Sequence, residues 1–113
     1  MYVDDCVEGL VRIMASDCRD ALNLGTDELV TINQLVDLVS EAADKPVTKR
    51  HNLTGPQGVR GRNSDNNRLR KELGWEPSIL LSKGLSLTYP WIEDQLRQAG
   101  RLSDQKETIG SAV

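Results

Sequence analysis

The fold is decided first by residues 31–43, whose sequence TINQLVDLVSEAA combines a helix start with a continuous apolar stripe. Thr31 and Gln34 match a capping box, in which each side chain accepts a hydrogen bond from the other residue's backbone N–H. The apolar residues recur at helical spacing, namely Ile32, Leu35, Val36, Val39, Ala42 and Ala43. A proline at 46 disfavours helical geometry in Lys45. The stretch therefore predicts an amphipathic helix that ends before Lys45.

Three further helices are predicted from local patterns. Apolar residues at Val7, Leu10, Val11 and Met14 indicate a helix over 5–16, for which Asp4 and Asp5 serve as N-terminal caps. A short helix capped by Asp65 carries Leu69 and ends at Gly74. A last helix begins near Ser82, and Pro90 predicts a kink or a break in it. Trp75 and Trp91 are expected in the core, since the chain has no Phe.

Two short strands complete the expected fold. Residues 21–25 (ALNLG) are typical of a buried strand, and residues 47–52 indicate a second one. The sequence thus predicts an α/β or α+β fold, a small and mostly helical domain with four or five helices and a few short strands. We expect residues 1–100 to form this domain and the polar, aperiodic residues 101–113 to form a flexible tail.

The composition bears on cellular location and on metal chemistry. No apolar run approaches the ~20 residues that span a bilayer, and the first residues are acidic, unlike a signal peptide. A cytoplasmic protein without membrane partners is the expectation. Cys6 and Cys18 lack the spacing of a zinc or redox motif, so we expect two reduced thiols and no metal site.

The charge distribution points to a small anionic ligand. Residues 45–71 contain eight Lys and Arg but a single acidic residue, Asp65, in a chain whose net charge is −3. A protein that binds long nucleic acid usually spreads positive charge over a whole face, and this basic segment has no interleaved aromatic residues. We therefore expect no nucleic-acid partner and a local anion site.

The loop at residues 58–65 is the main candidate for that site. Arg60 and Arg62 alternate with glycines ahead of a predicted helix N-terminus. A guanidinium group binds phosphate in a bidentate manner, glycines permit close approach, and a helix start adds partial positive charge. Together they favour a diphosphate. The alternative is that these arginines pair with acidic residues elsewhere and that the glycines only shape a turn.

The same residues carry a resemblance to a known family. The segments GVRGRNSDN at 58–66 and LGWEP at 73–77 resemble GDP-mannose 3,5-epimerases, which are extended short-chain dehydrogenases acting on nucleotide sugars. Further similar segments follow the family's order, namely YVDDCVEG at 2–9, NLG at 23–25 and GLSLTY at 84–89. The resemblance covers about residues 2–98. It implies that the chain is equivalent to the C-terminal, substrate-binding part of such an enzyme.

The resemblance also implies roles for individual residues. Arg62 would contact the diphosphate of a GDP-mannose-like nucleotide sugar, with Arg60 as a second contact and Asn63 beside them. Asp65 would fix the loop, although helix capping alone explains it. Asn23 would lie near the substrate cleft, although a turn-forming role explains it equally well.

The chain lacks the sequence features that the family uses for catalysis. Family members bind NAD through a Gly-x-Gly-x-x-Gly turn and use a Tyr-x-x-x-Lys pair, whereas Cys6 follows Tyr2 and Glu93 follows Tyr89 at that spacing. We therefore expect no catalytic residue and no cofactor in this chain alone, with NAD implied for the full-length enzyme. The expected partners are a second copy or a cofactor-binding polypeptide. The alternative is a non-catalytic module that oligomerises or binds a nucleotide diphosphate.

Overall fold

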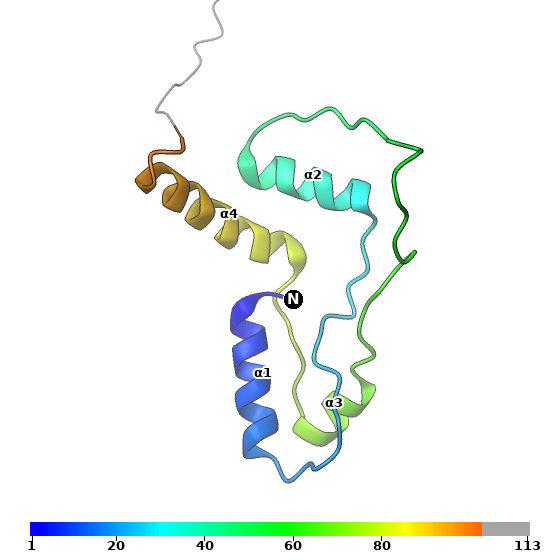
Figure 1. Cartoon of the computed structure of the whole chain (residues 1–113). Coiled ribbons are helices and arrows are strands. Elements are labelled where there is room, and N and C mark those ends of the chain that lie inside the picture. Colours follow the sequence, from blue (N-terminus) through cyan, green and yellow to red (C-terminus); the bar gives the residue numbers. More distant parts are fainter. Residues whose placement is uncertain (103–113) are drawn as a thin grey trace, which may run out of the picture.

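The computed structural model describes residues 1–102, and these form four α-helices joined by long connections (Figure 1). The helices are α1 (Val3–Ala15), α2 (Ile32–Ala43), α3 (Asn67–Leu73) and α4 (Leu81–Gln98). Helices α2 and α4 pack against each other at one end of the molecule, and α1 and α3 lie at the other end. The mostly helical character predicted from the sequence is confirmed.

Helix α2 forms as its capping box predicts. The Thr31 hydroxyl accepts a hydrogen bond from the Gln34 backbone N–H at 3.1 Å, and the Gln34 side chain accepts one from the Thr31 N–H at 2.7 Å. The helix ends at Ala43, and Asp44 adopts a left-handed conformation with φ 50°. Local sequence signals therefore set both ends of this helix.

The two predicted strands, at residues 21–25 and 47–52, are not formed, and residues 1–102 contain no strand. A strand is stabilised by a hydrogen-bonded ladder to a neighbour, and the apolar pattern of one segment cannot supply that neighbour. Residues 25–27 do lie along residues 63–66, but one backbone hydrogen bond joins them, from the Ser64 N–H to the Thr26 carbonyl at 2.9 Å. The prediction of strands was wrong for the described chain.

Helix α4 is continuous through Pro90, so the predicted break does not occur. Pro90 is exposed, and water can hydrogen-bond the backbone carbonyl that loses its helical partner there. The helix begins one residue before the predicted start. No helix within residues 1–102 is long and apolar enough to cross a membrane. The predicted tail lies for the most part outside the described residues, at 103–113.

Few side chains are buried within the described part of the chain. Leu69, at 1% exposed, is the only hydrophobic residue of 1–102 in the buried class, and it is accompanied by the polar residues Asp5 and Asn66. Trp91 is 64% exposed, which contradicts its predicted place in a core. The apolar stripes that shape the helices are thus only partly covered by this chain.

Candidate functional site

The predicted loop at residues 58–65, here called the arginine loop, is fixed at its C-terminal end. The Asn63 side-chain amide donates to the Asp27 carbonyl at 3.0 Å, and the Ser64 N–H donates to the Thr26 carbonyl at 2.9 Å. The Asn66 amide donates to the Gly25 carbonyl at 2.9 Å. The donors at 63, 64 and 66 thus bind the carbonyls of residues 27, 26 and 25, so the two segments run antiparallel. The loop end is held by residues about 40 positions earlier in the chain.

Close packing at this junction requires glycine at position 25. A Cβ atom there would lie 2.9 Å from the Ser64 Cβ, which is closer than side chains tolerate. Asn66 is 2% exposed and stands at the start of α3, three residues before the buried Leu69. The Ser64 hydroxyl and the side-chain Oδ1 of Asn66 are also buried, and neither has a hydrogen-bond partner in the described structure. The base of the arginine loop is therefore a tightly packed polar junction.

Arg60 and Arg62 are exposed, and neither forms a hydrogen bond or an ion pair with any residue of 1–102. Other basic residues of the same segment are paired with carboxylates at 2.5 Å, namely Lys49 with Asp37, Arg68 with Asp20 and Arg70 with Glu76. The hydrogen bond to Asp20 raises the pKa of Arg68 above its ordinary value. Pairing with carboxylates, the alternative considered for the loop arginines, is thus found for the arginines of α3 and not for Arg60 and Arg62.

The remaining predicted residues differ in how they relate to the loop. Asp65 accepts a hydrogen bond from the Asn67 N–H at 2.9 Å and so satisfies a donor of the first turn of α3, although Asn66 holds the N-cap position. Asn63 commits its amide nitrogen to Asp27. Asn23 is exposed, with no hydrogen bond to the loop among the described contacts. Asn63 and Asp65 thus form hydrogen bonds that hold the loop and the start of α3, whereas Asn23 forms no hydrogen bond with the loop among the described residues.

The helix start that sequence analysis added to the site contributes little. Helix α3 has only 7 residues, and its N-cap side chain makes no capping hydrogen bond. The positive end of so short a helix is a weak anion attractor compared with two full charges on guanidinium groups. The anion-binding capacity of this site therefore depends on the arginine side chains.

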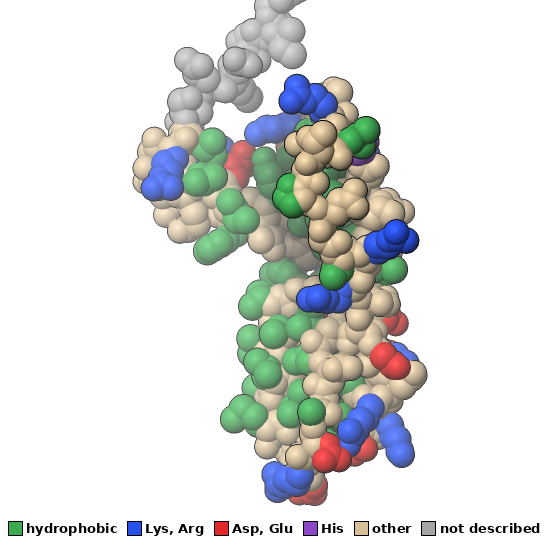
Figure 2. Space-filling model, turned by 45° about the vertical axis from the view of Figure 1, so that its right-hand side comes forward, with side chains coloured by type: hydrophobic (Ala, Val, Ile, Leu, Met, Phe, Trp, Pro, Cys, Tyr) green, Lys and Arg blue, Asp and Glu red, His purple; other side chains and the backbone are tan. Residues whose placement is uncertain are grey.

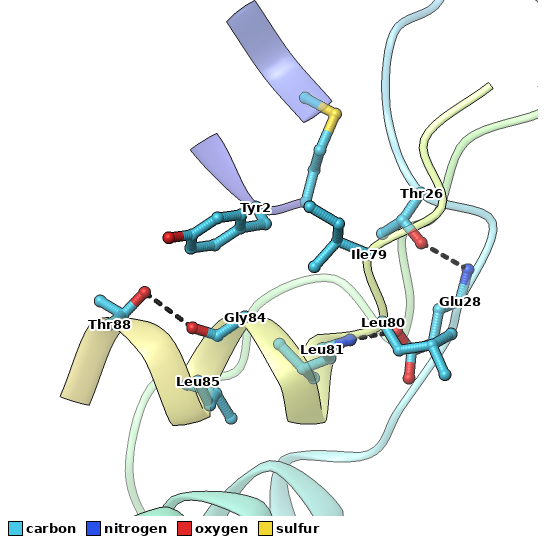
Figure 3. A pocket seen from close by; sticks show the side chains of 10 residues that line it. Tyr2, Thr26, Glu28, Ile79, Leu80, Leu81, Gly84, Leu85 and Thr88 are labelled. Atoms are coloured by element: carbon cyan, nitrogen blue, oxygen red, sulfur yellow. Dashed lines mark hydrogen bonds between the residues drawn. The ribbon is translucent and has the colours of Figure 1, made fainter. Parts of the chain in front are cut away.

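A hollow lies beside the first turns of α4 (Figure 3). Two of its polar side chains form hydrogen bonds within the chain, since Glu28 accepts one from the Leu81 N–H at 2.8 Å and Thr26 accepts one from the Glu28 N–H at 3.1 Å. Glu28 thereby caps α4 from a distance, because Leu80 at the N-cap has no acceptor side chain. The Thr26 carbonyl also accepts the hydrogen bond from the Ser64 N–H of the arginine loop. Residues 26–28 therefore contact both the arginine loop and the start of α4.

Sequence reasoning missed the residues that hold the loop. Gly25, Thr26 and Asp27 act through backbone carbonyls, for which side-chain identity gives no signal. Asn66 is the exception, because it belongs to the motif at 58–66 and its side chain makes a specific contact. Within residues 1–102, no group of three or more His, Cys, Asp or Glu gathers as metal ligands would, and Cys6 and Cys18 are free thiols.

Comparison with known proteins identifies related sequences, although no family model matches the chain. The chain is 40% identical to GDP-mannose 3,5-epimerase from Arabidopsis thaliana over 111 residues, 98% of this chain and 29% of that protein. It is 41% identical to GDP-mannose 3,5-epimerase 1 from Oryza sativa subsp. indica over 97 residues, 86% of this chain and 25% of that protein. UDP-glucuronic acid decarboxylase 6 from Arabidopsis thaliana is 35% identical over 86 residues, 76% of this chain and 25% of that protein.

These similarities extend over most of this chain but over less than a third of each relative's length. The matched region is the C-terminal part of the GDP-mannose 3,5-epimerases. The predicted resemblance is confirmed: over most of its length, this chain is homologous to the C-terminal part of GDP-mannose 3,5-epimerases, within the extended short-chain dehydrogenase family.

Proposed function

We propose that this chain is the part of a cytoplasmic nucleotide-sugar epimerase that binds the diphosphate of a GDP-mannose-like substrate, and that it catalyses no epimerisation alone. The observation that carries the proposal is the state of Arg60 and Arg62, which are exposed and unpaired within residues 1–102. Neighbouring arginines in α3 are neutralised by carboxylates. Unneutralised guanidinium groups on a fixed loop suit a doubly charged ligand such as a diphosphate.

The anchoring of the loop supports this role. Asn63, Ser64 and Asn66 fix the loop end against residues 25–27, so less conformational freedom is lost when a ligand binds. Arg62 directly precedes Asn63, the first residue of this anchor, and is the principal diphosphate contact, with Arg60 as the second. Asn63 and Asp65 act as positioning residues, and Asn23 as a more distant contact of the same substrate.

The chemistry of epimerisation lies outside this chain. NAD, which the resemblance implies for the full-length enzyme, would supply transient oxidation of the sugar. The residues present do not fit NAD, because the glycines at 55, 58 and 61 do not form a Gly-x-Gly-x-x-Gly turn and residues 1–102 form no strand to precede one. This chain's own residues bind and orient the substrate.

Calorimetric titration tests the binding proposal. We expect the purified chain to bind GDP-mannose and GDP, and Arg62→Ala to weaken both about 10- to 100-fold, since a hydrogen bond to a charged group contributes about 1.5–3 kcal/mol. Arg50→Ala is the matched control, because Arg50 lies in the same basic segment, is exposed and is outside the loop. Equal losses in both variants, or guanosine binding as tightly as GDP, would refute the diphosphate contact.

A turnover assay tests the second half of the proposal. Purified chain incubated with NAD and GDP-mannose should yield no galactose or gulose epimer, whereas the full-length Arabidopsis enzyme serves as the positive control. Epimer formed by this chain alone would refute the proposal that it binds the substrate without catalysing epimerisation.

A second candidate function is a non-catalytic module that self-associates, favoured by the exposed apolar side chains of α1. Under this alternative, light scattering at micromolar concentration should give a mass above that of a monomer, and neither GDP nor GDP-mannose should bind. The nucleotide titration therefore separates the two candidates.

A further inference from the structure

The arginine loop runs antiparallel to residues 25–29, and the contacts between the two segments keep one register. Two hydrogen bonds and one apolar contact join three residue pairs, namely 26 with 64, 27 with 63 and 29 with 61. The same register places Glu28 opposite Arg62. Opposite positions of antiparallel segments bring long side chains within reach of each other and favour pairs of opposite charge.

Arginines elsewhere in the basic segment do pair with carboxylates. Arg68 pairs with Asp20 and Arg70 with Glu76, each at 2.5 Å. Figure 2 shows basic side chains beside acidic ones at the end of the molecule that carries α3. Arg62, by contrast, is exposed and unpaired within residues 1–102, although a carboxylate lies at the opposite position. The missing pair has a physical cause.

That cause is the start of α4, which binds the Glu28 carboxylate (Figure 3). The carboxylate accepts a hydrogen bond from the Leu81 N–H at 2.8 Å, and the Glu28 backbone N–H donates to the Thr26 hydroxyl at 3.1 Å. The first N–H groups of a helix have no partner within the helix and carry partial positive charge. Leu80 at the N-cap offers no acceptor side chain. The helix start therefore competes with Arg62 for this carboxylate and holds it.

We propose that Glu28 is a positioning residue: by capping α4, its carboxylate is kept from pairing with Arg62, which leaves that guanidinium group free for an anionic ligand. The inference rests on the proposed function for the identity of that ligand, a nucleoside diphosphate. When Glu28 is released from α4, its carboxylate pairs with Arg62 and competes with the diphosphate for the same N–H donors. The start of α4 thus controls the anion site from outside the arginine loop.

Two substitutions at the start of α4 release Glu28 and give the helix a start of its own. Leu81→Pro removes the N–H group that Glu28 binds, at the first helical position, where proline is favoured. Leu80→Ser adds a neutral N-cap side chain for the next N–H groups. Leu80 is 61% exposed and has ψ 154°, which suits a residue before proline. Far-UV circular dichroism checks that α4 forms in this doubly substituted protein, here called the release variant.

NMR of the Arg62 side chain tests the contact without a ligand. The Nε–Hε signal of Arg62, identified by its loss in Arg62→Ala, should move downfield in the release variant, because a charge-assisted hydrogen bond forms. Adding Glu28→Gln should return the signal to its wild-type position. Adding Asp27→Asn instead, which removes the neighbouring exposed carboxylate, should not return it.

Two further proteins control for changes at the helix start. Leu80→Ala combined with Leu81→Ala removes the same side chains but keeps the N–H group at position 81, so the Arg62 signal should stay in place. Glu28→Asp leaves the sequence of α4 unchanged and shortens the side chain by one methylene, which takes the carboxylate out of reach of the Leu81 N–H. The Arg62 signal should then move in the same direction as in the release variant.

Calorimetric titration with GDP measures the consequence for the anion site. The release variant should bind GDP about threefold to fivefold more weakly than the wild-type chain, the factor that an exposed ion pair supplies. With Glu28→Gln added, its affinity should lie within about twofold of that of Glu28→Gln alone, because the released side chain no longer carries a charge.

Two outcomes would overturn the inference. The first is an Arg62 signal that stays at its wild-type position in both the release variant and Glu28→Asp. The second is a loss of GDP affinity in the release variant that persists after Glu28→Gln is added, which would assign the loss to a displaced loop. Failure of every protein to bind GDP, the wild-type chain included, would refute the diphosphate site, and the NMR signal would still decide whether Glu28 pairs with Arg62.

Discussion

The surroundings of the buried Asp5 and the arginine loop use polar and charged groups in opposite ways. Asp5 in α1 is buried and accepts hydrogen bonds from the backbone N–H groups of Ser78 and Ile79, while Leu69 in α3 is the one buried hydrophobic side chain of residues 1–102. In the arginine loop, Arg60 and Arg62 are exposed and unpaired within the same described residues. Groups satisfied inside the chain hold the fold, and groups left unsatisfied at its surface remain available to a ligand.

The largest expected difference between the two regions comes from removing a leucine. Leu69→Ala should lower the free energy of unfolding by about 2–5 kcal/mol, because it removes buried apolar atoms and leaves a cavity. Leu53→Ala, at an 89% exposed position shortly before the arginine loop, should change it by less than about 0.5 kcal/mol. Urea denaturation followed by circular dichroism measures both. Similar midpoints for the two variants would contradict the contrast.

Removing a carboxylate should give an intermediate effect. Asp5→Ala leaves the N–H groups of Ser78 and Ile79 without their acceptor, and a buried donor left unsatisfied costs about 1–3 kcal/mol. Asp65→Ala in the arginine loop removes one exposed hydrogen bond to Asn67 and should cost less than about 1 kcal/mol. Amide hydrogen exchange at residues 78 and 79 should accelerate only in the Asp5 variant, and acceleration there in both would be the contrary result.

The smallest expected difference concerns glycine. Gly74 has φ 60° at the C-cap of α3, so Gly74→Ala should cost about 1 kcal/mol of stability through left-handed strain. Gly58 in the arginine loop has neither a positive φ nor a neighbour within 4 Å of an added Cβ. Gly58→Ala should therefore leave the free energy of unfolding unchanged, or raise it by about 0.4–1 kcal/mol. Thermal melts of both variants test the sign, and a larger loss at Gly58 would be inconsistent with its open surroundings.

Local signals predicted the helices well, because each depends on residues only a few positions apart. The capping box of Thr31 and Gln34 and the left-handed Gly74 are found as predicted. Asp5 was predicted as a helix cap, yet its carboxylate binds backbone groups 73 and 74 residues away. A sequence pattern cannot show that Asp5 binds Ser78 and Ile79, since an aspartate at a helix start suits a capping role equally well.

The strands failed for a related reason. Residues 21–25 have the apolar character of a buried strand, but a strand exists only where another strand pairs with it, and residues 1–102 supply none. Trp91 was likewise expected in a core and is exposed. Both segments carry apolar side chains that this chain alone leaves partly uncovered, which agrees with a sequence matching less than a third of its relatives.

The sequence suggested which loop could bind an anion, but it did not show which contacts hold that loop in place. Two arginines among glycines identified the loop, and the motif at 58–66 identified the related proteins. The contacts from Asn63, Ser64 and Asn66 to residues 25–27 were not predictable, because the acceptors are backbone carbonyls, which every residue possesses.

By itself, the sequence determined where the helices form, where positive charge is concentrated and to which enzymes the chain is related. These properties depend on the identity and spacing of neighbouring residues. Only the tertiary structure decided which arginines are neutralised, which aspartate is buried and which side of α1 faces outward. Those outcomes depend on groups that the folded chain brings together from distant positions, such as Asp20 with Arg68 and Asp5 with Ser78.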